Sequence, residues 1–154
     1  MTRRALQPVT PAALVESRDE AVDTLARTLW GESRGEPLRG IEAVAAVVVN
    51  RVAAARARRG HWWGSTVVEV CRKPFQFSCW NDGDPNSAKL RDIPPDHPAF
   101  ETCLRVARRA VAGTLPDPTD GATHYHARSV HPSWAMGRLP CAEIGGHLFY
   151  KDIP

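Results

Sequence analysis

Two apolar stretches with helical periodicity flank the segment GESRGE at residues 31–36, and this arrangement constrains the fold more than any other feature of the chain. The upstream stretch places its apolar residues on one helix face, at Val22, Leu25, Ala26 and Leu29. The downstream stretch repeats the same spacing at Leu38, Ile41, Ala45, Val48, Val52 and Ala55. We therefore expect two buried helices joined by a tight connection.

The expected ends of these helices are marked by residues with known preferences. Ser17 opens an S-x-x-E capping box at the start of the first helix, and Gly31 is expected to end that helix. Pro37 suits the first turn of the second helix. Glu32 and Glu36 then lie in the connection, which is a place where a lone catalytic acid can be held.

The rest of the chain predicts a third helix, a long loop and a small sheet. Asp96 can cap a helix that runs to Ala112, and Gly113 can stop it. Segment 66–71 predicts a short helix, whereas segment 72–95 is rich in turn-forming residues and is expected to be a loop. The later pieces ATHYHA and EIGGHLFYK suit a small antiparallel hairpin. Helices followed by a small sheet place the chain in the α+β class.

Length and hydropathy favour one domain. A chain of 154 residues with 43% apolar residues suits a single domain, which we place at residues 17–154 behind an extended arm at residues 1–16. No stretch approaches the roughly 18 consecutive apolar residues of a membrane span, and the N-terminal segment lacks the apolar centre of a secretory signal. We expect no membrane span, and either a phage-type lysin, a trimmed chain or non-classical export.

The charge pattern gives no sign of nucleic-acid binding. The formal net charge is +3, and basic residues cluster at 56–59 and 105–109, as is typical of solvated helix faces. A weak positive field favours approach to an anionic polymer such as a cell wall, but no nucleic-acid motif accompanies it. We expect a monomer that does not bind nucleic acid.

Four cysteines leave the redox state open. They allow two disulfides in three connectivities, or four free thiols, and their spacing is not a zinc signature. The cysteines are Cys71, Cys79, Cys103 and Cys141.

Five segments carry the most specific pattern in the chain. They are GESRGEPLRGIEAVAAVVVNRV from residue 31, QFSCWND at 76–82, THYH at 123–126, HPSW at 131–134 and IGGHLFY at 144–150. In this order, over residues 20–150, they resemble the catalytic domain of spore cortex-lytic cell wall hydrolases of the SleB/CwlJ type. The resemblance implies a peptidoglycan-cleaving enzyme with the lysozyme-like arrangement of lytic transglycosylases.

The resemblance also implies a catalytic residue. Cleavage of a β-1,4 glycosidic bond needs an acid that protonates the leaving oxygen, and the resemblance assigns this role to Glu32. In a lytic transglycosylase the C6 hydroxyl of the muramyl sugar attacks, so one Glu serves as acid and then as base and leaves a 1,6-anhydro product. The implied target is the MurNAc-GlcNAc bond in peptidoglycan glycan strands, with the vegetative wall as the expected source.

A hydrolytic reaction would want a second carboxylate, about 5–5.5 Å from the first for retention or about 6.5–9.5 Å for inversion. Glu36 is the nearest candidate in the sequence, and Asp82 and Asp84 are alternatives in the long loop. Glu36 can equally cap the amides of the second helix, and the aspartates suit a turn. We count Glu36 among the substrate-contacting residues and leave open the alternative that it caps the second helix.

Sugar-binding side chains are expected within the matched segments. Amides and hydroxyls bind sugar hydroxyls and N-acetyl groups, and aromatic rings pack against pyranose faces. The candidates are Gln76, Ser78, Trp80, Asn81, His124, Tyr125 and Trp134. Core packing is the alternative for each aromatic residue, although the polar neighbours of Trp80 and Tyr125 favour a cleft.

A metal site is a competing hypothesis. His124, His126 and His131 lie in a stretch that also holds Asp117 and Asp120, and an H-x-H pair on a strand puts both rings on one face. The implied reaction needs no metal, so we expect neither a metal nor a cofactor. Two other functions stay open, namely a metal-dependent cell-wall amidase or peptidase that uses these histidines and a wall-binding module without catalysis.

Overall fold

The computed structural model describes residues 16–74, 76–94 and 96–154, so the expected N-terminal arm lies outside the described residues except for Glu16. In chain order the elements, with η marking 3-10 helices, are α2 (Arg18–Ser33), α3 (Leu38–Ala57), α4 (Val67–Arg72), η1 (Ser78–Trp80), α5 (Pro85–Arg91), α6 (Pro98–Ala112), β1 (His124–Ala127), η2 (Ser133–Ala135), β2 (Ala142–Ile144) and β3 (His147–Tyr150).

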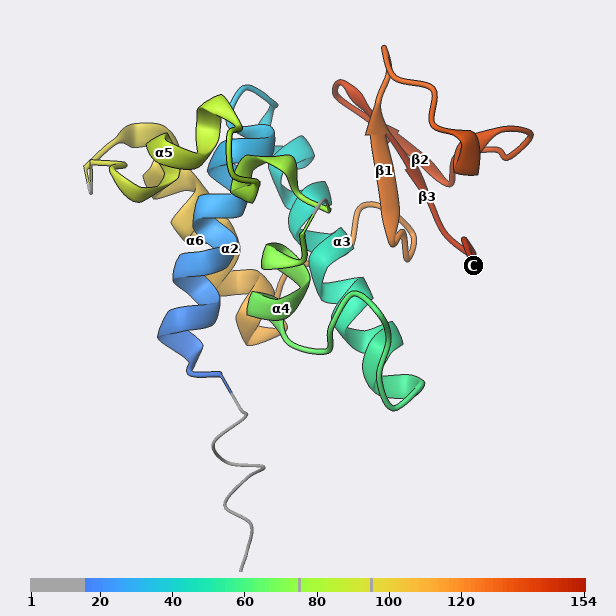
Figure 1. Ribbon diagram of the computed structural model, residues 1–154, viewed down its shortest axis with the longest axis horizontal. Coiled ribbons are helices and arrows are strands. Elements are labelled where there is room, and N and C mark those ends of the chain that lie inside the picture. The colour runs from blue at the N-terminus through green and yellow to red at the C-terminus, as the bar shows by residue number, and fades with distance from the viewer. Residues whose placement is uncertain (1–15, 75, 95) are drawn as a thin grey trace, which may run out of the picture.

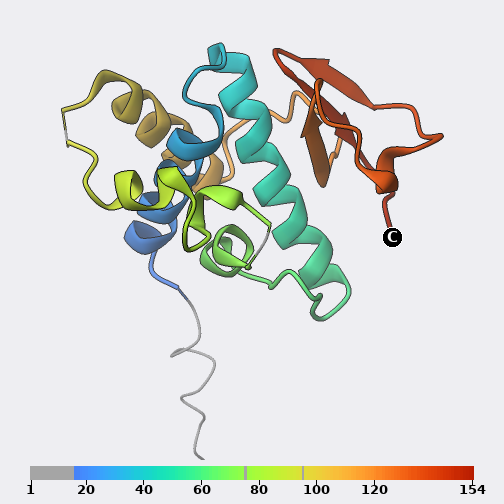
Figure 2. The same ribbon diagram turned by 45° about the horizontal axis from the view of Figure 1, so that its top comes forward.

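Helix α3 lies between the small sheet and the other helices (Figures 1 and 2). One side of α3 packs against α2, α4 and α6. The other side carries Ala43 and Val47 into a second core cluster, which they share with Ile144 and Phe149 of the sheet. Every residue from Ala43 to Val48 is buried, because this part of α3 has only apolar side chains and packs on both sides. Helix α3 therefore holds the two halves of the molecule together.

Helix α2 begins where the sequence predicts and ends later. The Ser17 hydroxyl oxygen accepts a hydrogen bond from the Glu20 amide at 3.0 Å, which confirms the cap. The helix continues past Gly31, so the prediction that Gly31 ends it is wrong. Gly31 serves close packing instead, because a Cβ there would lie only 2.7 Å from the Cβ of Cys79. Glu32 consequently lies in the last turn of α2, not in the connection.

The later helices confirm some predicted boundaries and correct others. The short helix expected at 66–71 is confirmed as α4. Gly113 ends α6 in the left-handed conformation, at a φ of 77°, as predicted. The predicted cap at Asp96 is wrong, because His97 is the N-cap and its Nδ1 accepts an amide hydrogen bond at 3.2 Å. Pro98 suits the first helical position, which makes the residue before it the cap.

The segment 72–95 is only partly the loop that its composition predicts. It contains η1 and α5, and the Asp84 side chain caps α5 by accepting a hydrogen bond from the Asn86 amide at 2.8 Å. Pro85 follows the cap at the first position of α5, where its missing amide costs nothing. The pair Asp84-Pro85 therefore starts a helix within a segment whose composition is otherwise typical of a loop.

The sheet has three antiparallel strands in the order β1-β3-β2. The predicted antiparallel pairing of ATHYHA with EIGGHLFYK is confirmed as β1–β3, and the second piece also forms a hairpin with the added strand β2, whose turn holds Gly145 at a φ of 57°. Strand β1 pairs with the other edge of β3 and sets Tyr125 opposite Phe149. The fold is α+β, mainly helical with a small antiparallel sheet, as the sequence predicts.

Two further observations concern the described residues as a group. None of their helices is long and apolar enough to cross a membrane. All four cysteines are free thiols, and Cys71, Cys79 and Cys103 are buried in the main core.

Candidate active site

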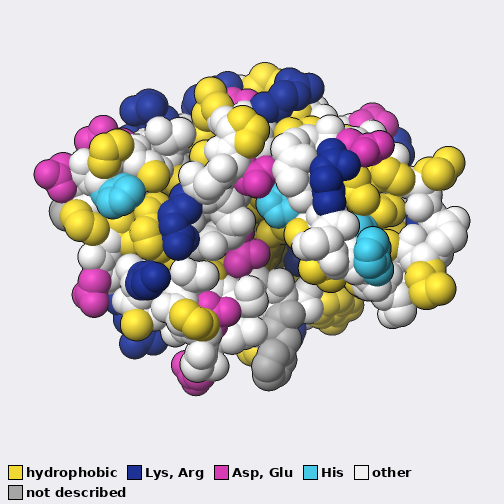
Figure 3. Space-filling model, turned by 90° about the horizontal axis from the view of Figure 1, so that it is seen from above, with side chains coloured by type: hydrophobic (Ala, Val, Ile, Leu, Met, Phe, Trp, Pro, Cys, Tyr) yellow, Lys and Arg dark blue, Asp and Glu magenta, His cyan; other side chains and the backbone are white. Residues whose placement is uncertain are grey.

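Glu32 lies where the helical part of the molecule meets the sheet, and its side chain is partly exposed. Figure 3 looks onto the end of the molecule where α2 ends and α3 begins, and acidic, basic and histidine side chains alternate over this face without one dominant sign of charge. Two donors hold the Glu32 carboxylate. The Tyr125 hydroxyl donates to Oε1 at 3.0 Å, and the Cys79 amide donates to Oε2 at 3.3 Å.

Tyr125 comes to Glu32 from β1, on the far side of the site from α2. Its ring stacks on Phe149 at 5.6 Å between centroids and lies 6.4 Å from Phe77. Burial, reinforced by the nearby Glu32 carboxylate, raises the pKa of Tyr125 well above its ordinary value. The phenol therefore keeps its proton and acts as the donor in the bond to Glu32.

Cys79 comes to Glu32 from η1, and Gly31 permits this approach. A side chain at Gly31 would collide with both Cβ and Sγ of Cys79, at 2.7 and 2.9 Å. The glycine that precedes Glu32 thus lets η1 lie against α2 with the Cys79 amide directed at the carboxylate. A strand and a loop far apart in the sequence fix the position of one acidic side chain.

Glu36 is turned toward the β2–β3 hairpin. Its Oε1 accepts a hydrogen bond from the Gly146 amide at 2.8 Å and lies 3.8 Å from Nδ1 of His147. No side chain caps the N-terminus of α3. Glu36 therefore links the α2–α3 connection to the sheet and does not serve as the helix cap that the sequence left open.

His147 belongs to the site, although sequence reasoning did not select it. Its ring meets the Tyr125 ring edge-on, with 5.0 Å between centroids, and so lies close to the Glu32 contact. Burial lowers the pKa of His147, while the carboxylates of Glu36 and Glu32 oppose that shift. The available signal was its place in the matched segment IGGHLFY, next to the glycine pair.

Three predicted polar residues lie on the segment that carries the Cys79 amide. Gln76 accepts a long hydrogen bond from Arg51 at 3.5 Å, Ser78 begins η1 at the surface, and Asn81 follows η1 and is partly exposed. The expectation that these three side chains contact sugar stays a prediction.

Arg51 is a buried cation beside this segment that sequence reasoning also missed. Its Nε donates to the Thr123 carbonyl at 2.7 Å, and its guanidinium lies over the rings of Trp63 and Phe77 at 5.2 and 5.5 Å. Burial lowers the pKa of Arg51 to about 10, so it stays charged at neutral pH. Arg51 ties α3 to the start of β1, two residues before Tyr125.

Trp80 contacts α2 at Thr28, one helical turn before Glu32. Its indole N–H donates to the Thr28 hydroxyl at 2.8 Å, and Arg72 lies over its ring at 4.5 Å. The structure therefore brings Tyr125 to Glu32, whereas Trp80 packs between α2 and α4. The expectation that Trp80 contacts sugar stays a prediction.

His124 and His126 share one face of β1, as an H-x-H pair on a strand should. Trp134 packs against both rings, with centroids 5.2 and 5.7 Å away. Both ring nitrogens of His126 have partners, at the Ala127 carbonyl and the Tyr150 hydroxyl. Within the part of the chain that the structure describes, no group of three His, Cys, Asp or Glu side chains is arranged to hold a metal ion.

The aspartates that the sequence offered as a second carboxylate, Asp82 and Asp84, or as possible metal ligands, Asp117 and Asp120, have other surroundings. Asp84 caps α5, and Asp82 is exposed. Asp117 accepts hydrogen bonds from Thr119 and Gly121, and Asp120 pairs with Lys151. These contacts match the turn and capping roles that the sequence allows for such residues.

The chain has a helical body, a small sheet and one carboxylate held between them. This arrangement is typical of lysozyme-like proteins. Comparison with known families places the chain within that class. The sequence model of the cell wall hydrolase family matches residues 35–150, and the chain therefore belongs to this family. The match begins three residues after Glu32, so the choice of Glu32 depends on its contacts and on the motif.

Curated relatives include spore cortex-lytic enzymes from several bacilli. The enzyme of Bacillus cereus is 33% identical over 133 residues, which are 84% of this chain and 44% of that protein. The enzyme of Halalkalibacterium halodurans is 31% identical over 134 residues, which are 85% of this chain and 34% of that protein. The chain thus spans less than half the length of these relatives.

Two solved structures share the fold. The catalytic domain of SleB from Bacillus anthracis, described as a germination-specific lytic transglycosylase, is 29% identical with a TM-score of 0.66, and the match covers 90% of this chain and 98% of that one. The catalytic domain of the Bacillus cereus SleB protein is 29% identical with a TM-score of 0.68, covering 90% and 94%. The lysozyme-like fold expected from the sequence is confirmed.

Proposed function

We propose that the chain cleaves peptidoglycan as a lytic transglycosylase, with Glu32 as its acid and base. The observation that carries the proposal is the pair of donors on the Glu32 carboxylate, from Tyr125 at 3.0 Å and from the Cys79 amide at 3.3 Å. They orient a single acid between a helix end and a sheet. The likeness to a SleB catalytic domain described as a lytic transglycosylase supports the same reaction.

The two contacts suggest how Glu32 acts first as an acid. Tyr125 makes the shorter bond, to Oε1, and stays protonated, so we assign the transferable proton to Oε2. The Cys79 amide contact to Oε2 is the longer and weaker of the two. In this proposal Oε2 gives its proton to the glycosidic oxygen. Protonation releases the leaving sugar while positive charge develops on the muramyl ring.

In the second step Glu32 acts as a base. The C6 hydroxyl of the same muramyl sugar attacks its anomeric carbon and gives its proton to the carboxylate formed in the first step. Glu32 is restored, no water is consumed, and the product ends in a 1,6-anhydro sugar. Glu36 is engaged with the hairpin and Asp84 with α5, which supports a reaction that needs one carboxylate.

The substrate contacts belong to the same proposal. Aromatic and polar side chains of the matched segments would bind the glycan, namely Glu36, Gln76, Ser78, Trp80, Asn81, His124, Tyr125 and Trp134. We propose that the chain acts as a monomer on glycan strands at the cell wall. The vegetative wall is the expected source of these strands.

A paired substitution tests the role of Glu32. Glu32→Gln keeps the shape of the side chain but removes the transferable proton, so release of soluble fragments from purified wall should fall at least a hundredfold with the melting temperature preserved. Glu36→Gln is the matched control and should be milder. Near-normal lysis by Glu32→Gln would reject the assignment, and loss of lysis in chelator would favour the metal-dependent amidase.

A further inference from the structure

An exposed tryptophan lies on the loop that follows α3. Trp62 is 50% exposed, whereas the other large apolar side chains that are exposed in the described residues are aliphatic or methionine. Scattered exposed apolar residues are ordinary on a protein surface, so exposure alone does not indicate a binding site. Trp62 differs because it is the exposed end of a series of neighbouring aromatic rings.

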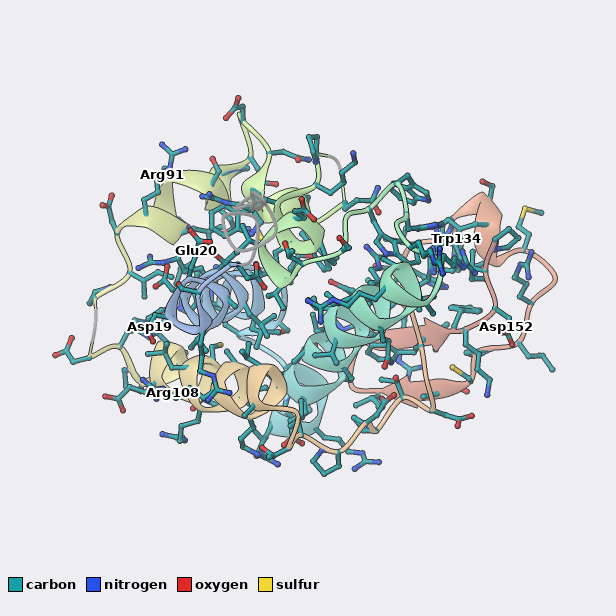
Figure 4. The ribbon with its side chains drawn as sticks, turned by 90° about the horizontal axis from the view of Figure 1, so that it is seen from below. Asp19, Glu20, Arg91, Arg108, Trp134 and Asp152 are labelled. Atoms are coloured by element: carbon teal, nitrogen blue, oxygen red, sulfur yellow. The ribbon has the colours of Figure 1, made fainter. Side chains whose placement is uncertain are left out.

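These rings come from three separate elements. Trp62 lies 5.6 Å from Trp63, Trp63 lies 5.8 Å from His124 of β1, and His124 lies 5.2 Å from Trp134 of η2. Figure 4 shows that Trp134 lies on the side of the molecule that carries the sheet. We call Trp62, Trp63, His124 and Trp134 the aromatic row.

The aromatic row has a rigid base. Trp63 is only 3% exposed, and its indole N–H donates to the Arg51 carbonyl at 3.0 Å. Burial lowers the pKa of His124 to about 4, so this ring is uncharged at neutral pH. The exposed Trp62 and the partly exposed Trp134 therefore lie beside two rings, Trp63 and His124, that are packed in place.

Buried side chains join the base of the aromatic row to the candidate active site. The Arg51 guanidinium lies over both Trp63 and Phe77, and Phe77 packs beside Tyr125, which holds Glu32. The two places therefore share one packed support.

The chemistry at Trp62 fits a sugar ring. A pocket is lined by His61, Trp62 and Trp63 together with the charged side chains of Glu69 and Lys73. Aromatic faces pack against the C–H faces of a pyranose, while charged and polar groups at the pocket edge bind its hydroxyl and amide groups. A flat apolar surface with a polar edge is the combination that an N-acetylhexosamine ring requires.

We propose that Trp62 and the aromatic row form a carbohydrate-binding surface, away from Glu32, for an N-acetylhexosamine ring of the same glycan strand. The proposal rests on the proposed function, because it assigns the strand held at Glu32 to a second place on the molecule. The surface would favour long strands over short fragments and keep the enzyme on its polymer between cleavages.

The test measures binding without cleavage. In the Glu32→Gln background, chitohexaose, a β-1,4 chain of six N-acetylglucosamine units, is titrated by calorimetry and by NMR of the tryptophan indole N–H signals. Chitohexaose should shift the Trp62 signal, and Trp62→Ala should weaken binding roughly tenfold, since an aromatic contact contributes about 0.5–1.5 kcal/mol. Trp62→Tyr, which keeps a ring, should recover most of the affinity.

A matched control separates this effect from exposure itself. Leu38→Ala removes an apolar side chain that is 53% exposed at the other end of α3, and it should leave binding unchanged. The proposal is overturned if Trp62→Ala binds chitohexaose within twofold of its parent, or if the Trp62 signal does not move. Failure of the proposed function would appear elsewhere, as an unmodified chain that releases no fragments from wall.

Discussion

Gly31→Ala is the substitution whose consequence the structure defines most closely. The added Cβ would lie 2.7 Å from Cβ and 2.9 Å from Sγ of Cys79, and 3.1 Å from Leu90, where ordinary contacts are 3.4–4 Å. Overpacking of this kind costs about 1–3 kcal/mol of stability. The higher helix propensity of alanine relative to glycine offsets up to about 1 kcal/mol of that cost. We expect a net loss of about 1–2 kcal/mol, which lowers the melting temperature by roughly 2–8 °C.

The same substitution should reduce activity beyond the loss of stability. Relief of the clash moves Cys79 away from α2, and its amide is the donor to Oε2 of Glu32 at 3.3 Å. Loss of a hydrogen bond to a charged group costs about 1.5 kcal/mol or more, which corresponds to about a tenfold lower rate per folded molecule.

Gly35→Ala is the matched control within the same motif. A Cβ at Gly35 would have no heavy atom within 4 Å, and its φ is not positive. Its melting temperature and its rate of wall clearance should match those of the unmodified chain. The packing argument fails if Gly31→Ala melts and lyses like Gly35→Ala.

Three further predictions follow from single contacts. Tyr125→Phe removes the hydroxyl that donates to Glu32 and should lower the rate of wall clearance about tenfold, and an unchanged rate would show that Tyr125 is only packing. Glu36→Ala removes the acceptor of the Gly146 amide and should destabilise the protein by about 1–2 kcal/mol in a thermal melt, whereas Glu36→Gln, which keeps an oxygen acceptor, should cost less. Burial lowers the pKa of His124 from 6.5 to about 4, so the unfolded chain binds a proton more readily and stability should fall as pH drops from 6.5 to about 4. His124→Gln should flatten melting temperature against pH in that window, and an equally steep dependence in the variant would contradict this origin.

Much of the fold followed from patterns that report burial directly. The periodic apolar residues of α3 predict a buried helix, and Ser17 and Gly113 mark helix ends through a hydrogen bond and a positive φ, respectively. Gly31 was misread because a glycine that ends a helix and one that admits a neighbouring chain look alike in a sequence. Only the packed position of Cys79 distinguishes them.

The candidate site was predictable in part for a similar reason. Glu32 and Tyr125 lie in matched segments, yet the hydrogen bond between them joins residues 93 positions apart, and no local pattern reports it. Arg51 resembled an ordinary helix residue, and its burial depends on where Trp63 and Phe77 pack. Trp80 has polar neighbours in the sequence, but its indole N–H donates a hydrogen bond to the Thr28 hydroxyl of α2.

The chemical nature of the product ends tests the central claim most directly. Purified wall is digested with the unmodified chain, and the released muropeptides are analysed by mass spectrometry before and after borohydride reduction. A single Glu32 that serves as acid and base predicts fragments lighter by one water than the products of hydrolysis and resistant to borohydride. Fragments with reducible ends would contradict the account, because they would show that a second group activates water.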